Sequence, residues 1–91
     1  MKKTLEHFQQ EIEYDGTEMR AFFLSVGRRI QAIRKKKGIS QLELSNMLGF
    51  KSTSLIAGAE SGYHNIKFSL EHLYKISKAL NVSIKEFFDF E

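Results

Sequence analysis

The stretch GISQLELSNMLGF, residues 38 to 50, followed by KSTSLIAGAESG, residues 51 to 62, decides the fold because it predicts two short consecutive helices. Ser40 and Glu43 have the spacing of a capping box, in which the serine oxygen accepts the amide of Glu43 and the glutamate accepts the amide of Ser40. The helix that follows is expected to end at Gly49 and to turn its apolar side chains inward. These side chains are Leu44, Met47 and Leu48.

The second helix is expected to begin at Ser52, the next capping residue, and to run to about Ser61, where Gly62 ends it. Two short helices joined through residues 49 to 51 have the helix-turn-helix pattern. In that pattern, the first helix crosses the DNA backbone and the second enters the major groove. Many helical bundles contain similar turns, so the spacing alone does not distinguish a DNA-binding domain from another bundle.

Helical periodicity continues on both sides of this pair. Residues 17 to 37 are expected to form one core helix, and Ser69 is expected to cap another helix that breaks at Asn81. The inward stripe of the first helix is Met19, Phe22, Phe23, Val26, Ile30 and Ile33, and that of the second is Leu70, Leu73, Ile76 and Leu80. Ser83 and Glu86 predict a second capping box at the start of a short last helix. No segment is expected to be a strand.

At 91 residues and 42% hydrophobic content, the chain is long enough for one domain with a single core. The predicted fold is all-α: a compact five-helix domain over residues 18 to 91, preceded by an amphipathic helical extension over residues 1 to 17. The extension carries Leu5, Phe8 and Ile12 and is net acidic, whereas the whole chain has a net charge of +3. The basic surface for a partner is therefore expected after the extension.

Composition and motifs indicate a soluble, cytoplasmic protein without enzymatic activity. No apolar run is long enough to span a bilayer, and residues 1 to 8 lack the apolar segment of a secretory signal. The absence of cysteine excludes disulfides and thiolate metal sites. His7, His64 and His72 lack the spacing of a zinc site, and neither a glycine-rich phosphate loop nor a nucleophile elbow is present. We therefore expect no catalytic residue, metal or cofactor, and we expect His72 on the solvated side of its helix.

Three segments resemble the helix-turn-helix domain of the lambda/Cro-type (XRE) repressor family: IRKKKGISQLELSNMLGF at residues 33 to 50, ESG at 60 to 62, and LYKISKALNVSIKEFF at 73 to 88. They include an arginine before a basic turn, a Ser-Gln helix start and an Ala-Leu-Asn-Val-Ser link into the last helix. The resemblance implies a lambda-repressor-like fold and a sequence-specific transcriptional regulator, of repressor or controller type, that binds double-stranded DNA. It places the helix at residues 52 to 61 in the major groove.

The resemblance also implies roles for single residues. Gln41 is expected to bind phosphate at the positive end of its helix, and Arg34 and Glu60 to form a structural ion pair. The DNA-binding positions at the second helix are Lys51, Ser52, Thr53, Ser54, Leu55, Ala57 and Gly58. Because these positions carry hydroxyl groups, apolar groups and a glycine, we expect only modest direct readout of base edges, with a bias toward A·T pairs. Gly58 suggests a close backbone approach to DNA or, alternatively, tight packing on a neighbouring helix.

The link after the second helix, residues 63 to 68, is longer than is usual in the family. It places four polar residues where relatives touch phosphates or reach the minor groove: Tyr63, His64, Asn65 and Lys67. The alternative is a surface loop that Ile66 and Phe68 anchor in the core, and the two interpretations are compatible. For the lysines at residues 35 to 37, a solvated charge run and phosphate contact both stay open.

The C-terminal phenylalanines cannot all face one small core. Phe87 is expected to point inward, which leaves surplus apolar surface for a homodimer interface. The candidates for this interface are Phe88, Phe90, Leu5, Phe8 and Ile12, although these side chains could instead pack on each other within one chain. An alternative function is an antitoxin or another protein-interaction module of the same fold, with the acidic N-terminal extension binding a protein partner.

Overall fold

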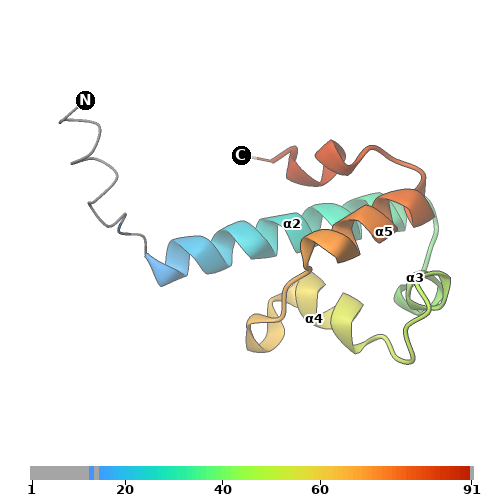
Figure 1. The fold of residues 1–91 in the computed structure, drawn as a ribbon, viewed down its shortest axis with the longest axis horizontal. Helices are drawn as coiled ribbons and strands as arrows, with labels where there is room; N and C mark the ends of the chain where they lie inside the picture. Colours follow the sequence, from blue (N-terminus) through green and yellow to red (C-terminus); the bar gives the residue numbers. More distant parts are fainter. Residues whose placement is uncertain (1–12, 14, 91) are drawn as a thin grey trace.

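The computed structural model of the chain describes residue 13 and residues 15 to 90, and within them it contains α-helices, short 3-10 helices and no strand (Figure 1). In chain order these are α2 (Gly16–Lys36), α3 (Gln41–Met47), α4 (Ser54–Ser61), the 3-10 helix η1 (Tyr63–Asn65), α5 (Leu70–Leu80) and the 3-10 helix η2 (Ile84–Phe88). The all-α class is thus confirmed for the described residues. The last of the five expected helices is the 3-10 helix η2.

The expected N-terminal extension lies largely outside the described residues, and this includes Leu5, Phe8 and Ile12. Because α2 begins at Gly16, the boundary expected after residue 17 falls inside the first turn of this helix. Asp15 precedes α2, and its carboxylate accepts a hydrogen bond from the amide of Thr17 at 2.9 Å.

Side-chain caps set the starts of two helices, as predicted. Ser40 and Glu43 form both bonds of a capping box, at 3.0 Å and 2.8 Å, and these bonds hold the pKa of Glu43 below its ordinary value. Ser69 caps α5, where His72 supplies the returning acceptor: its Nδ1 accepts the amide of Ser69 at 3.0 Å. The helix α5 ends at Asn81, whose left-handed backbone (φ 57°) matches the expected break.

Two predicted caps are wrong. Thr53, not Ser52, precedes α4, and it makes no side-chain capping bond; the Ser52 hydroxyl instead accepts the amide of Ser54 at 3.3 Å. The expected box at Ser83 is absent because η2 has the tighter 3-10 geometry and its start carries no side-chain cap. The carboxylate of Glu86 is placed near Arg29 of α2, at 3.5 Å, rather than at the helix start.

The core lies around α2, which packs against α4 and η2, while α3 packs against α4 and α5. Figure 1 shows α2 crossing the molecule, with α4 on one side of it and the C-terminal segment on the other. The buried apolar residues are Val26, Ile30, Ile33, Leu44, Ile56, Ala59, Phe68, Leu73, Ile76, Leu80 and Phe87. The inward position of Phe87 is therefore confirmed.

Four residues expected inside are exposed. Met19 and Phe22 lie on the first turns of α2, which extend beyond the other described elements in Figure 1, so their apolar stripe continues past the core. Met47 is the last residue of α3 and Leu70 is the first residue of α5. Both stand at helix ends, where the packed turns stop.

Candidate functional site

The turn between α3 and α4 has a fixed geometry. Gly49 adopts a left-handed backbone (φ 78°), which a residue with a side chain adopts less easily. The next residue, Phe50, donates its amide to the carbonyl of Ser45 at 2.9 Å, and its half-buried ring packs against the core. These contacts fix the path of the chain where it leaves α3 toward α4, and α3 and α4 pack against each other as a helix-turn-helix unit.

A buried ion pair joins α2 to α4. The Nε of Arg34 lies 2.8 Å from one carboxylate oxygen of Glu60, and an NH2 group of the same guanidinium lies 2.8 Å from the other. Both side chains are at most 5% exposed. The remaining guanidinium nitrogen donates to the carbonyl of Ile39 at 2.7 Å. The expected pairing is thus present, and Arg34 is directed into the protein rather than toward a ligand.

Gln41, expected to bind phosphate, takes part in the same buried network. Its side-chain nitrogen donates to Glu60 at 2.9 Å, and Gln31 of α2 donates to the same oxygen at 3.3 Å. An amide nitrogen carries two hydrogens, so one N–H of Gln41 is engaged with Glu60 and one remains for an anion. Gln41 therefore connects the surface of α3 to the buried pair.

The outward face of α4 is short of polar side chains. Ile56, Ala59 and Glu60 are buried on its inner face, and Leu55 is half-buried against the core. At helical spacing, the other face carries Ser54, Ala57, Gly58 and Ser61. The Ser61 hydroxyl donates to the carbonyl of Ala57 at 2.9 Å, as serine does within helices. Ser54 therefore carries the one exposed hydroxyl on this face that does not bond back to α4.

The expected approach of DNA to Gly58 is wrong. Gly58 is buried, and a Cβ atom there would lie 2.6 Å from Cδ1 of Ile66. The close approach that requires glycine is therefore made by the loop after α4. Tight packing, the alternative interpretation, holds, although the partner is this loop and not a neighbouring helix.

The long loop presents its polar residues to solvent. Tyr63, His64, Asn65 and Lys67 are exposed, while Phe68 is buried and Ile66 is half-buried. The expected anchoring of the loop by its apolar residues is therefore present. The Lys67 ammonium lies 5.2 Å from the centre of the Phe23 ring, which directs it toward α2.

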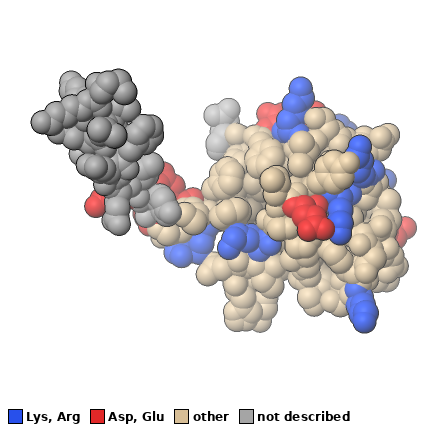
Figure 2. All heavy atoms as spheres, in the orientation of Figure 1, with Lys and Arg blue, Asp and Glu red and all other residues tan. Residues whose placement is uncertain are grey.

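The basic residues do not form a single patch on the face drawn in Figure 2, where Lys and Arg are spread over several parts of the surface. Lys51 and Ser52 are exposed before α4, and Thr53 is half-buried. The lysines at residues 35 to 37 are also exposed, at the end of α2. Lys51 is thus the lysine that the chain places directly before the candidate recognition helix.

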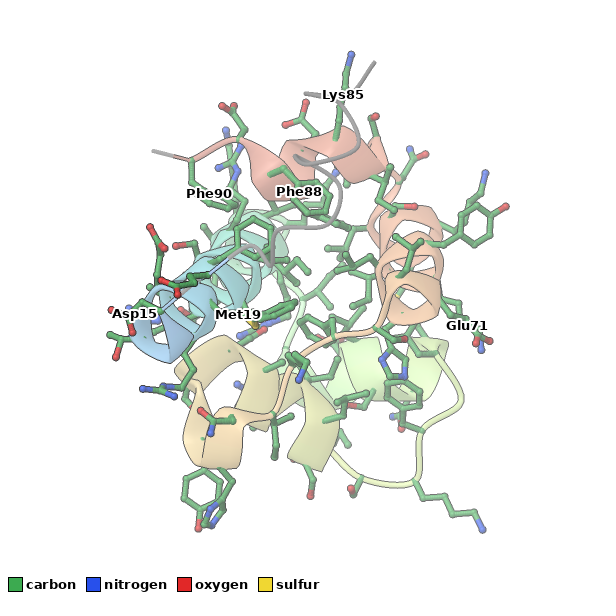
Figure 3. All side chains as sticks on the ribbon, turned by 60° about the vertical axis from the view of Figure 1, so that its left-hand side comes forward. Asp15, Met19, Glu71, Lys85, Phe88 and Phe90 are labelled. Carbon is green, nitrogen blue, oxygen red and sulfur yellow. The ribbon has the colours of Figure 1, made fainter. Side chains whose placement is uncertain are left out.

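An aromatic cluster missed by the sequence interpretation joins α2 to the C-terminus. The Phe22 ring lies 6.5 Å from that of Phe88, roughly parallel to it, and 5.9 Å from that of Phe90. Phe22 and Phe88 remain exposed, and Phe90 is half-buried. Figure 3 shows Phe88 and Phe90 on the C-terminal segment and Met19 on α2, which passes beside it. We call Phe22, Phe88 and Phe90 the aromatic face.

The histidines and carboxylates of the described residues do not gather into a group of three or more that could hold a metal ion. The expected solvated position of His72 is wrong: this residue is half-buried, because its ring caps α5 and its edge packs on Phe50 and Phe68. Among residues 13 and 15 to 90, no helix is long and apolar enough to cross a membrane.

Comparison with known proteins gives one finding. A family model described as "Helix-turn-helix" matches residues 30 to 87, which include α3, α4 and α5 and amount to more than half of the chain. No curated protein and no solved structure matches the chain.

Proposed function

The chain belongs to the helix-turn-helix family of the lambda/Cro type, and we propose that it is a sequence-specific transcriptional regulator that binds double-stranded DNA as a homodimer. In this proposal α4 enters the major groove and α3 crosses the DNA backbone. One observation carries the proposal: the buried pair of Arg34 and Glu60 fixes one side of α4 to α2, while Ser54 at the start of the helix stays exposed on the other side.

Phosphate contacts come from residues around the motif. Lys51 stands before α4 with its ammonium exposed, and the free N–H of Gln41 lies at the start of α3. Contacts to phosphate of this kind give affinity without sequence information. The proposed phosphate contacts are Lys51 and Gln41.

Base contacts come from the start of α4 and from the loop after it. The hydroxyls of Ser52, Thr53 and Ser54 can donate to or accept from base edges, and Leu55 and Ala57 can contact thymine methyl groups. The loop contributes Tyr63, His64 and Asn65. Gly58 has no place in this set, because the chain itself covers it.

We include a homodimer in the proposal because one copy of the chain offers few contacts to bases. A single reading helix with few polar side chains gives low discrimination, whereas two copies on half-sites about one helical turn, roughly 34 Å, apart add their contacts. The aromatic face supplies exposed apolar surface for the contact between copies. The same face could instead bind a different protein, and the oligomeric state in solution distinguishes the two. The antitoxin alternative places its protein partner on the N-terminal extension, which lies largely outside the described residues.

The proposal is tested by selecting bound duplexes from a random pool and by measuring affinity against salt concentration. We expect a consensus with two-fold symmetry. Lys51→Ala should lower the slope of log affinity against log salt by about one unit on every sequence, because one phosphate contact is lost. Lys85→Ala is the matched control, since Figure 3 places Lys85 on η2, across α2 from α4.

An unchanged slope for Lys51→Ala would remove this lysine from the interface. A pool that stays random after repeated selection would contradict sequence-specific binding.

A further inference from the structure

The second turn of α4 has little side-chain capacity to hydrogen-bond the edges of bases. Gly58 has none, Ala57 offers one methyl group, and the Ser61 hydroxyl donates to carbonyls of its own helix. Recognition helices discriminate base pairs through donors and acceptors that reach the base edges. On the outward face of α4, this leaves the discrimination to Ser54 in the first turn.

The loop after α4 occupies the surface that a side chain at Gly58 would occupy. The Cδ1 of Ile66 would lie 2.6 Å from a Cβ at Gly58, and its Cβ and Cγ2 would each lie 3.1 Å away. At these distances a larger residue at Gly58 would displace the Ile66 side chain from its position. Ile66 therefore seats the loop directly on the outward face of α4, beside the first-turn serine.

The residues before Ile66 form a tight turn. Gly62, His64 and Asn65 all adopt left-handed conformations, with φ of 77°, 52° and 58°. Two turn bonds close the segment: the Asn65 amide donates to Gly62 at 3.2 Å, and the Ile66 amide donates to Tyr63 at 2.9 Å. The two bonds constrain the backbone of the loop before a ligand arrives, which reduces the backbone entropy lost on binding.

The side chains that this backbone presents suit base recognition. The rings of Tyr63 and His64 pack edge to face, with centroids 4.0 Å apart, and the amide of Asn65 follows them. All three are exposed. Together they offer a phenol, an imidazole and an amide, each with hydrogen-bonding groups that can reach base edges.

We propose that Ile66 is a positioning residue that moves much of the base discrimination from α4 to the loop at residues 63 to 65. The loop reads the minor groove next to the major groove that α4 enters, because it lies past the C-terminal end of α4, whereas recognition helices point their N-terminal residues at the bases. This inference rests on the proposed DNA-binding function. It makes the pair Gly58 and Ile66 a determinant of specificity without direct contact to a base.

The test compares the base preferences of variants by selection from random duplexes. Ile66→Ala and Gly58→Ala should each flatten the preference at the flanking base pairs by about tenfold and leave the affinity for unselected DNA unchanged. The double variant should lose no more than either single variant, because both changes act through one contact. Ile84→Ala, another half-buried isoleucine, and Gly16→Ala, whose Cβ would meet only an Arg20 nitrogen at 3.5 Å, are the matched controls.

Asn65→Gly keeps the test decisive if Gly58→Ala fails to fold. Glycine adopts the left-handed backbone of Asn65 without strain, so only the amide is removed and the preference at one flanking pair should relax. Replacing flanking G·C pairs by inosine·C changes the minor groove and leaves the major-groove donors and acceptors intact. Wild-type affinity should respond to that replacement, and the affinity of Ile66→Ala should not.

Unchanged flanking preferences in Ile66→Ala and Asn65→Gly, with Ser54→Ala alone flattening the profile, would overturn the inference and leave the proposed function standing. A wild-type protein without any base preference would instead defeat the proposed function itself.

Discussion

Glu60 is the residue on which the orientation of the reading helix depends. Its carboxylate accepts hydrogen bonds from Arg34, Gln31 and Gln41, and its backbone carbonyl accepts one from Arg28 at 3.2 Å. Buried carboxylates are costly unless they are paired in this way. The donors come from α2 and α3, so a single side chain ties both helices to α4.

Arg34→Ala should therefore destabilise the protein before it affects specificity. Removing one partner of a buried ion pair typically costs about 3 to 5 kcal/mol of unfolding free energy, because the other charge is left buried without compensation. Chemical denaturation measures the loss, with Arg20→Ala, an exposed arginine of the same helix, as the control. A wild-type unfolding midpoint together with lost DNA binding would make Arg34 a DNA ligand instead.

At the scale of elements, the helix boundaries depend on local hydrogen bonds. The helix α3 begins at the Ser40 capping box, and α4 ends at Gly62 with its left-handed backbone. Both places are those that the sequence predicts. Ser83 has the same pattern in sequence but makes no cap, because η2 is a 3-10 helix and the Glu86 carboxylate lies beside Arg29. A capping pattern in sequence is therefore not sufficient when a distant charge competes for the glutamate.

This difference predicts unequal effects of two identical substitutions. Ser40→Ala should lower the free energy of unfolding by about 0.5 to 2 kcal/mol, the usual effect of losing an N-cap. Ser83→Ala should be close to neutral, since its side chain makes no capping bond. Equal losses for the two variants, measured by denaturation under one set of conditions, would mean that Ser83 caps a helix in solution.

The parts of the site that sequence could predict are those that follow from local pattern. The helix pair and its caps are of this kind, and the Arg34 and Glu60 pairing followed from family resemblance. The contact between Gly58 and Ile66 could not be predicted, because the path of a loop decides which atoms meet a glycine. The exposure of Phe22 was also missed, since helical periodicity gives the face of a helix but not where its neighbours end.

At the scale of the whole molecule, the aromatic face is an exposed apolar surface, among the described residues, that joins two distant parts of the chain. Phe22 comes from α2, and Phe88 and Phe90 come from the C-terminal segment. Because Phe90 is half-buried against the core, Phe22 and Phe88 are the better candidates for contact with a second copy. The interface proposed from the C-terminal phenylalanines thus extends to α2.

A Phe22→Asp, Phe88→Asp double variant should be a folded monomer with weaker binding to the selected duplex. Both residues are exposed, 45% and 41%, and neither belongs to the buried core, so the fold should tolerate the two charges. Sedimentation measures the oligomeric state, and Leu70→Asp, at an exposed leucine on α5, is the control. A wild-type protein that stays monomeric at high concentration, both free and on its selected duplex, would defeat the dimer and favour a different protein partner.

The central claim is that this helix-turn-helix chain distinguishes DNA sequences. The most direct measurement is competition between the selected duplex and a scrambled duplex of the same composition, at one physiological salt concentration. Specific regulators bind their sites about 10³-fold or more tightly than other DNA, and we predict a ratio of at least that order for the wild-type protein. Equal affinities for the two duplexes would contradict the account.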